Sequence, residues 1–147
     1  RPAGPFGLGP DSHSPVGLFA GGIGITPCRS MIKHARERDP TRPLTLVYAN
    51  RRREDAAFLH ELESWANDNP SFRLLATMTE SGESGRDWDG LTGYVDSDFL
   101  RRHLPELPSG GCYVAGSPRF VSAVSRTLRE AGLDEGRLRT DQFAGYE

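Results

Sequence analysis

The sequence lacks most of the features that mark secreted, membrane-spanning or metal-binding chains. Its two cysteines, Cys28 and Cys112, are too few for a disulfide framework, and no C-x-x-C or H-E-x-x-H spacing occurs, so we expect no metal site. No apolar run approaches the roughly 20 residues that a membrane span needs, and no signal peptide is recognisable. Because the chain begins at Arg1 rather than methionine, we expect an excised or truncated piece of a cytoplasmic protein.

An excess of charge of one sign is also lacking. The chain has 18 basic and 20 acidic residues and a formal net charge of −2, so it offers no basic field for nucleic acid or an anionic membrane. The arginine runs at 51–53 and 101–102 have no interleaved aromatic residues and indicate solvated surface. Lys33 is the only lysine. Recognition of a phosphate would therefore fall to arginine, whose planar fork suits it.

The order of apolar and helical segments predicts the fold class. The length of 147 residues suits one domain, preceded by the Gly- and Pro-rich residues 1–15. Helical patterns begin at Pro27, at Glu54, at Asp96 and at Pro118. Strand-like segments alternate with them, which predicts an α/β fold: a doubly wound, open parallel sheet of about five strands with helices on both faces. The expected strands are 16–20, 44–49, 72–78, 112–116 and 137–143.

The segment 54–68 is predicted to form one continuous helix. Glu54 and Asp55 fall in its first turn, where the helix dipole favours acidic residues. Apolar residues recur at helical spacing and are expected to face the core. They are Phe58, Leu59, Leu62 and Ala66.

A glycine-bearing stretch, 20-AGGIGITP-27, joins the first expected strand to a helix. Gly22 and Gly24 would let a phosphate approach the backbone without meeting a Cβ atom. Thr26 is predicted as the N-cap and Pro27 as the first helical residue, which leaves free N–H groups for an anion. The ordinary G-x-G-x-x-G pattern fails, because Pro27 takes the place of the third glycine. The alternative is a tight glycine turn that binds nothing.

A second stretch of the same construction, 115-AGSP-118, follows a later strand and again opens a helix with proline. The carboxyl ends of parallel strands meet at one edge of a sheet, where ligands bind. Two such loops therefore predict a shared cleft at that edge.

The ordered motifs GGIGITP, YANRRRED, YVAGSP and RTDQFAGY resemble the pyridine-nucleotide-binding domain of the ferredoxin–NADP reductase family, over residues 4 to 146. The resemblance implies that residues 1–15 end an FAD-binding barrel domain and that residues 16–147 form the NAD(P)H-binding domain. The barrel's Arg-x-Tyr-Ser motif is absent from this chain. We therefore expect one half of a flavoprotein oxidoreductase, inactive alone, that presents NADPH or NADH for hydride transfer to FAD. The electron acceptor is not identified.

The resemblance also implies which residues bind the cofactors. Near the pyrophosphate and nicotinamide it places Gly21, Gly22, Gly24, Thr26 and Pro27, and on the opposite wall Gly116, Ser117 and Pro118. Near the adenosine ribose it places Asn50, Arg51 and Asp55. Phe143 and Tyr146 either stack near the flavin or close the core. Ala115 stands where many relatives have a cysteine, so no catalytic residue is assigned.

The loop 48-YANRRRED-55 leaves the choice of nucleotide open. An arginine of 51–53 would bind the 2′-phosphate of NADPH, whereas Asp55 would suit the ribose hydroxyls of NADH. A non-catalytic nucleotide-binding or regulatory module is the alternative function, supported by Ala115 and the missing barrel. A receiver-type signalling domain is disfavoured, because no expected strand ends in aspartate.

Overall fold

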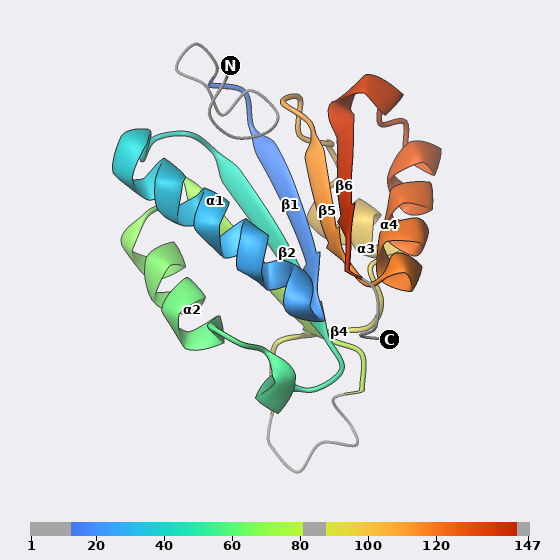
Figure 1. Cartoon of the computed structure of the whole chain (residues 1–147), viewed down its shortest axis with the longest axis horizontal. Coiled ribbons are helices and arrows are strands. Elements are labelled where there is room, and N and C mark those ends of the chain that lie inside the picture. Colours follow the sequence, from blue (N-terminus) through green and yellow to red (C-terminus); the bar gives the residue numbers. More distant parts are fainter. Residues whose placement is uncertain (1–12, 81–87, 144–147) are drawn as a thin grey trace.

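A computed structural model describes residues 13–80 and 88–143 of the chain. The described strands form one parallel sheet of six strands in the order β4-β3-β2-β1-β5-β6 (Figure 1). Their bounds are β1 Val16–Gly21, β2 Leu44–Asn50, β3 Phe72–Met78, β4 Leu91–Thr92, β5 Cys112–Gly116 and β6 Leu138–Gln142. The prediction of an open parallel α/β sheet is confirmed. The additional strand, β4, has two residues and is too short for a periodic pattern to reveal.

Helices cover both faces of the sheet, as predicted (Figure 1). One layer of core residues packs under α1, Ile25–Arg38, and α2, Leu59–Asp68. The other packs under α3, Ser97–His103, and α4, Pro118–Glu130. Because the central strands are buried on both sides, β1 and β2 consist almost wholly of buried residues and lack the alternation of a half-exposed strand.

The expected helix over 54–68 is wrong in its first part. Residues Arg53–Asp55 form a separate 3₁₀ turn, and α2 begins only at Leu59. Phe58 has φ of 63°, a left-handed conformation that interrupts the helix, and its side chain is 45% exposed rather than in the core. The buried hydroxyl of Tyr48 donates a hydrogen bond to the carbonyl of Ala57 at 2.9 Å, which holds the chain extended before α2.

The sequence predicts Asp96 or Ser97 as the N-cap of the helix that follows, and the structure has Asp96, which accepts from Phe99 N. Pro118 is the first residue of α4, as predicted, and Ser117 caps this helix, which the sequence analysis did not predict. The prediction of Thr26 as an N-cap is wrong, because Thr26 lies inside α1, which begins at Ile25 with Gly24 as its N-cap. Residues Gly22–Gly24 form a 3₁₀ turn that continues directly into α1, so the helix starts before the threonine.

The described residues contain no helix that is both long and apolar enough to cross a membrane.

Candidate functional site

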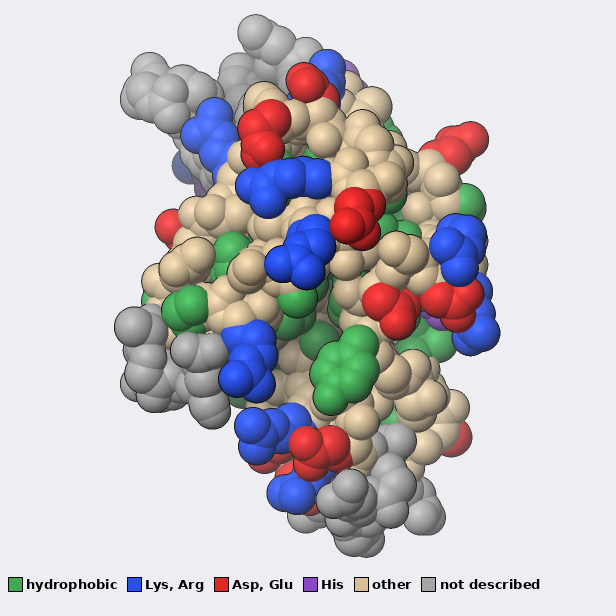
Figure 2. Space-filling model, turned by 90° about the vertical axis from the view of Figure 1, so that its right-hand side faces the viewer, with side chains coloured by type: hydrophobic (Ala, Val, Ile, Leu, Met, Phe, Trp, Pro, Cys, Tyr) green, Lys and Arg blue, Asp and Glu red, His purple; other side chains and the backbone are tan. Residues whose placement is uncertain are grey.

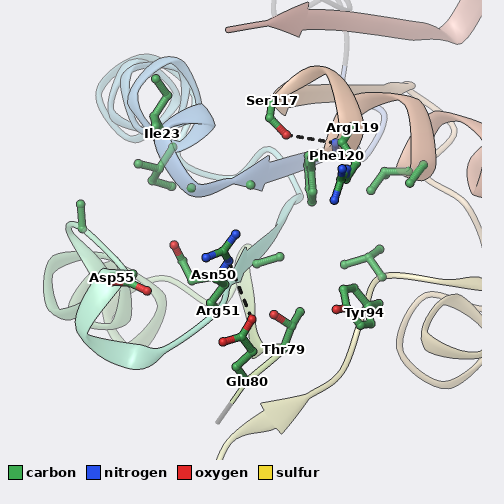
Figure 3. Close-up of a pocket in the computed structure, with 18 of the residues that line it drawn as sticks. Ile23, Asn50, Arg51, Asp55, Thr79, Glu80, Tyr94, Ser117, Arg119 and Phe120 are labelled. Atoms are coloured by element: carbon green, nitrogen blue, oxygen red, sulfur yellow. Dashed lines mark hydrogen bonds and ion pairs between the residues drawn. The ribbon is translucent and has the colours of Figure 1, made fainter. Parts of the chain in front are cut away.

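A cleft of about 990 Å³ opens at the carboxyl edge of the sheet (Figure 3). Its walls come from the segments that follow β1, β2, β3 and β5 and from the segment that precedes α3. The sheet order places β1 between β2 and β5, so successive strands run outward from β1 on both sides. This is the switch point at which open α/β sheets bind ligands.

The structure brings together seven of the predicted site residues. The cleft is lined by Gly21, Gly22, Thr26, Asn50, Arg51, Asp55 and Ser117. Five other predicted residues do not line it: Gly24, Pro27, Gly116, Pro118 and Phe143. Phe143 packs partly buried against the core under α1 and α2, and its amide donates to the carbonyl of Gly116 at 2.9 Å. Tyr146 lies outside the described residues.

The two glycine loops touch each other, which explains several of their glycines. A Cβ atom on Gly24 would lie 2.0 Å from the carbonyl oxygen of Ala115, so the chain after β1 packs directly on β5. A Cβ on Gly21 would lie 2.6 Å from the ring of Phe120, and one on Gly116 would lie 2.9 Å from the same ring. These glycines therefore let the segments that follow β1 and β5 approach each other closely.

The N-terminus of α1 faces the cleft through Thr26 and carries no side-chain cap. Its first N–H groups therefore have no partner from a capping side chain. Together with the positive end of the helix dipole, they form a site that favours an anion. The N-terminus of α4 differs, because the Ser117 hydroxyl accepts from Phe120 N at 3.2 Å.

Asn50, at the end of β2, supplies a buried polar group at the cleft. Only 7% of the residue is exposed, and its Nδ2 makes no hydrogen bond within residues 13–80 and 88–143. Leaving a buried donor without a partner costs about 1–3 kcal/mol. Nδ2 is shielded from solvent and the side chain also interacts with the hydroxyl of Tyr48, so Asn50 anchors the end of β2 beside the cleft.

The exposed apolar residues gather at the cleft. Among the described residues, the large hydrophobic side chains that are exposed are Ile23 at 37%, Phe58 at 45% and Tyr94 at 71%. All three line the cleft. An apolar surface beside convergent polar groups is typical of a site for a flat, partly apolar ligand.

Sequence reasoning missed several residues of the cleft. Thr79 and Glu80 follow β3, Tyr94 precedes α3, and Arg119 and Phe120 lie in the first turn of α4. Glu80 lies 3.8 Å from Arg51 and 3.7 Å from Arg52. The position of Glu80 at a strand end was the available signal, because strand ends meet at one edge. The contacts of Glu80 with Arg51 and Arg52 could not be predicted, because they require β3 to lie next to β2.

The described residues offer binding groups rather than a reactive nucleophile. Cys28 and Cys112 are fully buried, and burial raises the pKa of Cys112 to about 12 and that of Cys28 further. No group of three or more His, Cys, Asp or Glu side chains in the described part of the chain could hold a metal ion. Basic and acidic side chains are interspersed on the face shown in Figure 2, without a wide area of one sign.

The fold and the cleft define an α/β nucleotide-binding domain at the switch point of a parallel sheet. The chain belongs to the oxidoreductase NAD-binding domain family, whose model matches residues 18–126. The predicted resemblance to the nucleotide domain of ferredoxin–NADP reductase-like proteins is thereby confirmed.

Individual proteins resemble it along nearly its whole length. The chain is 29% identical to NADH-cytochrome b5 reductase 1 of Eremothecium gossypii, over 92% of this chain and 48% of that protein. It is 30% identical to reductase component 1 of terephthalate 1,2-dioxygenase from Comamonas sp, over 97% of this chain and 42% of that protein. The structure of the Amycolatopsis cytochrome P450 reductase GcoB has the same fold, with a TM-score of 0.79 and 23% identity over 99% of this chain and 43% of that chain. The chain thus spans half or less of the length of these proteins.

Proposed function

We propose that the cleft binds NAD(P)H and presents it for hydride transfer to an FAD carried on another domain, from which electrons pass to an acceptor. One observation carries the proposal: in a chain of the NAD-binding family, a cleft between two glycine loops is lined by Thr26 at the start of α1 and by Asn50 and Arg51 after β2. The cleft volume of about 990 Å³ suits a ligand as large as a dinucleotide.

The lining supports one orientation of the nucleotide. The pyrophosphate would lie at the uncapped N-terminus of α1, beside Thr26. The adenosine ribose would lie near Asn50, Arg51 and Asp55, and the nicotinamide near Ser117. Nicotinamide and flavin supply the hydride chemistry when bound, so the role of this chain is to bind and orient.

The flavin side of the function is part of the same proposal. Residues 1–15 would lead in from the FAD-binding domain, and residues 16–147 would form the nucleotide half. The support is that the curated relatives are about twice as long as the matched region. Those relatives are named for reactions with cytochrome b5 and with a dioxygenase, and we assign neither acceptor to this chain. We also propose a cytoplasmic location, which suits two free, buried cysteines.

A calorimetric titration with ADP tests the nucleotide site without the flavin domain. We expect binding by the wild-type chain and at least about tenfold weaker binding by Thr26→Glu, because a carboxylate at the start of α1 repels the pyrophosphate. The substitution should not unfold the helix, since acidic residues are favoured there. Ser30→Glu, one turn further along α1 and not in the cleft lining, is the matched control. Equal ADP affinity for Thr26→Glu and wild type would contradict the proposed orientation.

A further inference from the structure

Glu80 lies at the rim of the cleft, two residues after β3, and faces two arginines of the neighbouring loop. Its Oε2 is 3.8 Å from Nε of Arg51, and its Oε1 is 3.7 Å from Nη2 of Arg52. Figure 3 shows the pair with Arg51 beside Asn50 and Thr79. One carboxylate therefore bridges two guanidinium groups at the place where the adenosine ribose is proposed to lie.

The backbone fixes Glu80 at this place. The ladder between β2 and β3 ends at Asn50 and Met78. Two further backbone hydrogen bonds join the segments that follow β2 and β3. Thr79 N donates to Asn50 O at 2.9 Å, and Glu80 N donates to Arg51 O at 2.7 Å. The sheet therefore fixes the backbone of Glu80 beside the arginines, and the two ion pairs hold its carboxylate there.

Glu80 also balances the charge of the loop 51–55. The loop 51–55 alone contains three arginines and two acidic residues, an excess of one positive charge. With Glu80 the charges are equal in number. The Glu80 side chain is 33% exposed, against 68% for Arg51 and 41% for Arg52, so the carboxylate is the least screened of the three groups.

On the basis of the nucleotide site proposed above, we propose that Glu80 makes the cleft select NADH over NADPH. The 2′-phosphate of NADPH carries about 1.5 to 2 negative charges. To bind Arg51 it would have to displace the carboxylate of Glu80, whose backbone is held beside the arginine by the sheet. The 2′-hydroxyl of NADH is neutral and can donate a hydrogen bond to that carboxylate. Glu80 therefore attracts one ligand and repels the other.

Glu80 is thus a further residue that affects the choice between NADPH and NADH. The sequence analysis attributed that choice to the arginines 51–53 and to Asp55. Asp55 lies in the 3₁₀ turn Arg53–Asp55 and Glu80 beyond β3, on different sides of Arg51 in Figure 3. Glu80 forms an ion pair with both Arg51 and Arg52. It is therefore the group whose removal should release Arg51 for a phosphate.

Parallel calorimetric titrations with ADP and 2′,5′-ADP test the role of Glu80. The wild-type chain should bind ADP more tightly. Glu80→Gln, which keeps the size of the side chain, should shift the ratio of the two affinities towards 2′,5′-ADP by at least about tenfold. Arg51→Gln added to Glu80→Gln should cancel most of this shift. Glu37→Gln, which removes a carboxylate from the exposed pair with Lys33 at 3.3 Å on α1, should leave the ratio unchanged.

The possible failures are distinguishable. If Glu80→Gln binds ADP and the ratio of its affinities for ADP and 2′,5′-ADP equals that of the wild type, the role of Glu80 is overturned while the nucleotide site stands. A wild-type preference for 2′,5′-ADP overturns it equally. If none of the variants binds ADP at millimolar concentration, the nucleotide site itself is contradicted.

Discussion

Arg29 of α1 and Glu61 of α2 form a two-pronged ion pair, with Nε and Nη2 of the arginine 2.6 and 2.9 Å from the two carboxylate oxygens. The guanidinium also lies over the rings of Phe58 and Trp65, at 4.8 and 5.5 Å from their centroids. These contacts fix the start of α2 against α1. Because Phe58 lines the cleft, the pair also positions one of its walls.

Replacing Glu61 by glutamine should lower thermal stability slightly near neutral pH. Its hydrogen bond to Arg29 lowers the pKa of Glu61. The contribution of such a group is present above the unfolded pKa and is lost as the pH falls through the folded pKa. Thermal melts of wild type and Glu61→Gln should therefore converge as the pH falls through the lowered pKa of Glu61, and also in high salt. A difference that persists unchanged at acid pH would show that the ion pair is not its cause.

Because Gly24 lies so close to β5, replacing it by alanine should lower the stability far more than the same replacement at an open glycine. Gly24→Ala should cost about 1–3 kcal/mol or more, because the new methyl group meets backbone on the facing strand. Gly136→Ala is the matched control, since its Cβ has only an ordinary contact of 3.6 Å with Asp134. Urea unfolding of both variants measures the difference. Equal stabilities would mean that the loop after β1 does not pack on β5 as described.

The cysteines should be inert in the folded protein. Burial raises the pKa of Cys112 to about 12, and burial, followed by the charge of Asp141, raises that of Cys28. At mildly alkaline pH both are neutral thiols without solvent contact. Mass spectrometry after iodoacetamide treatment should find no modification of the native chain and two modified sites after denaturation. Rapid alkylation of either thiol in the native chain would be inconsistent with this core.

The hydroxyl of Tyr113 on β5 donates to Oδ2 of Asp141 on β6 at 2.6 Å and so links the edge strand β6 to the sheet. Burial, and then this hydrogen bond, raise the pKa of Tyr113. Tyr113→Phe should cost about 1.5 kcal/mol, the lower end of the range for a hydrogen bond to a charged group, because Asp141 is exposed to water. Chemical unfolding measures the loss. An unchanged or higher stability would contradict the assigned bond.

Much of the fold could be predicted from the sequence because its signals are local. The apolar runs at 72–78 and 112–116 match β3 and β5, Asp96 caps α3, and Pro118 begins α4 as expected. The interruption at Phe58 could not be predicted. It depends on the bond from Tyr48 to Ala57, which forms only once β2 lies under α2.

Some features of the candidate site could likewise be predicted from local sequence, whereas others depend on contacts between distant segments. The glycine loops were recognisable because glycine has few other uses between a strand and a helix. Their roles were not, since Gly24 touches β5 while Gly22 opens to the cleft. Glu80 could be found only through strand order, because it is far in sequence from the arginines that it contacts.

The central claim is that the cleft at the carboxyl edge of the sheet holds the nucleotide. Mapping of backbone amide chemical shifts by NMR during titration with NAD⁺ tests it most directly. The account predicts the largest changes at Gly21, Gly22, Thr26, Asn50, Arg51 and Ser117. The amides of α1 beyond Ser30 and those of Glu135–Arg137 should change little. Saturable changes centred elsewhere, or none at millimolar nucleotide, would contradict the account.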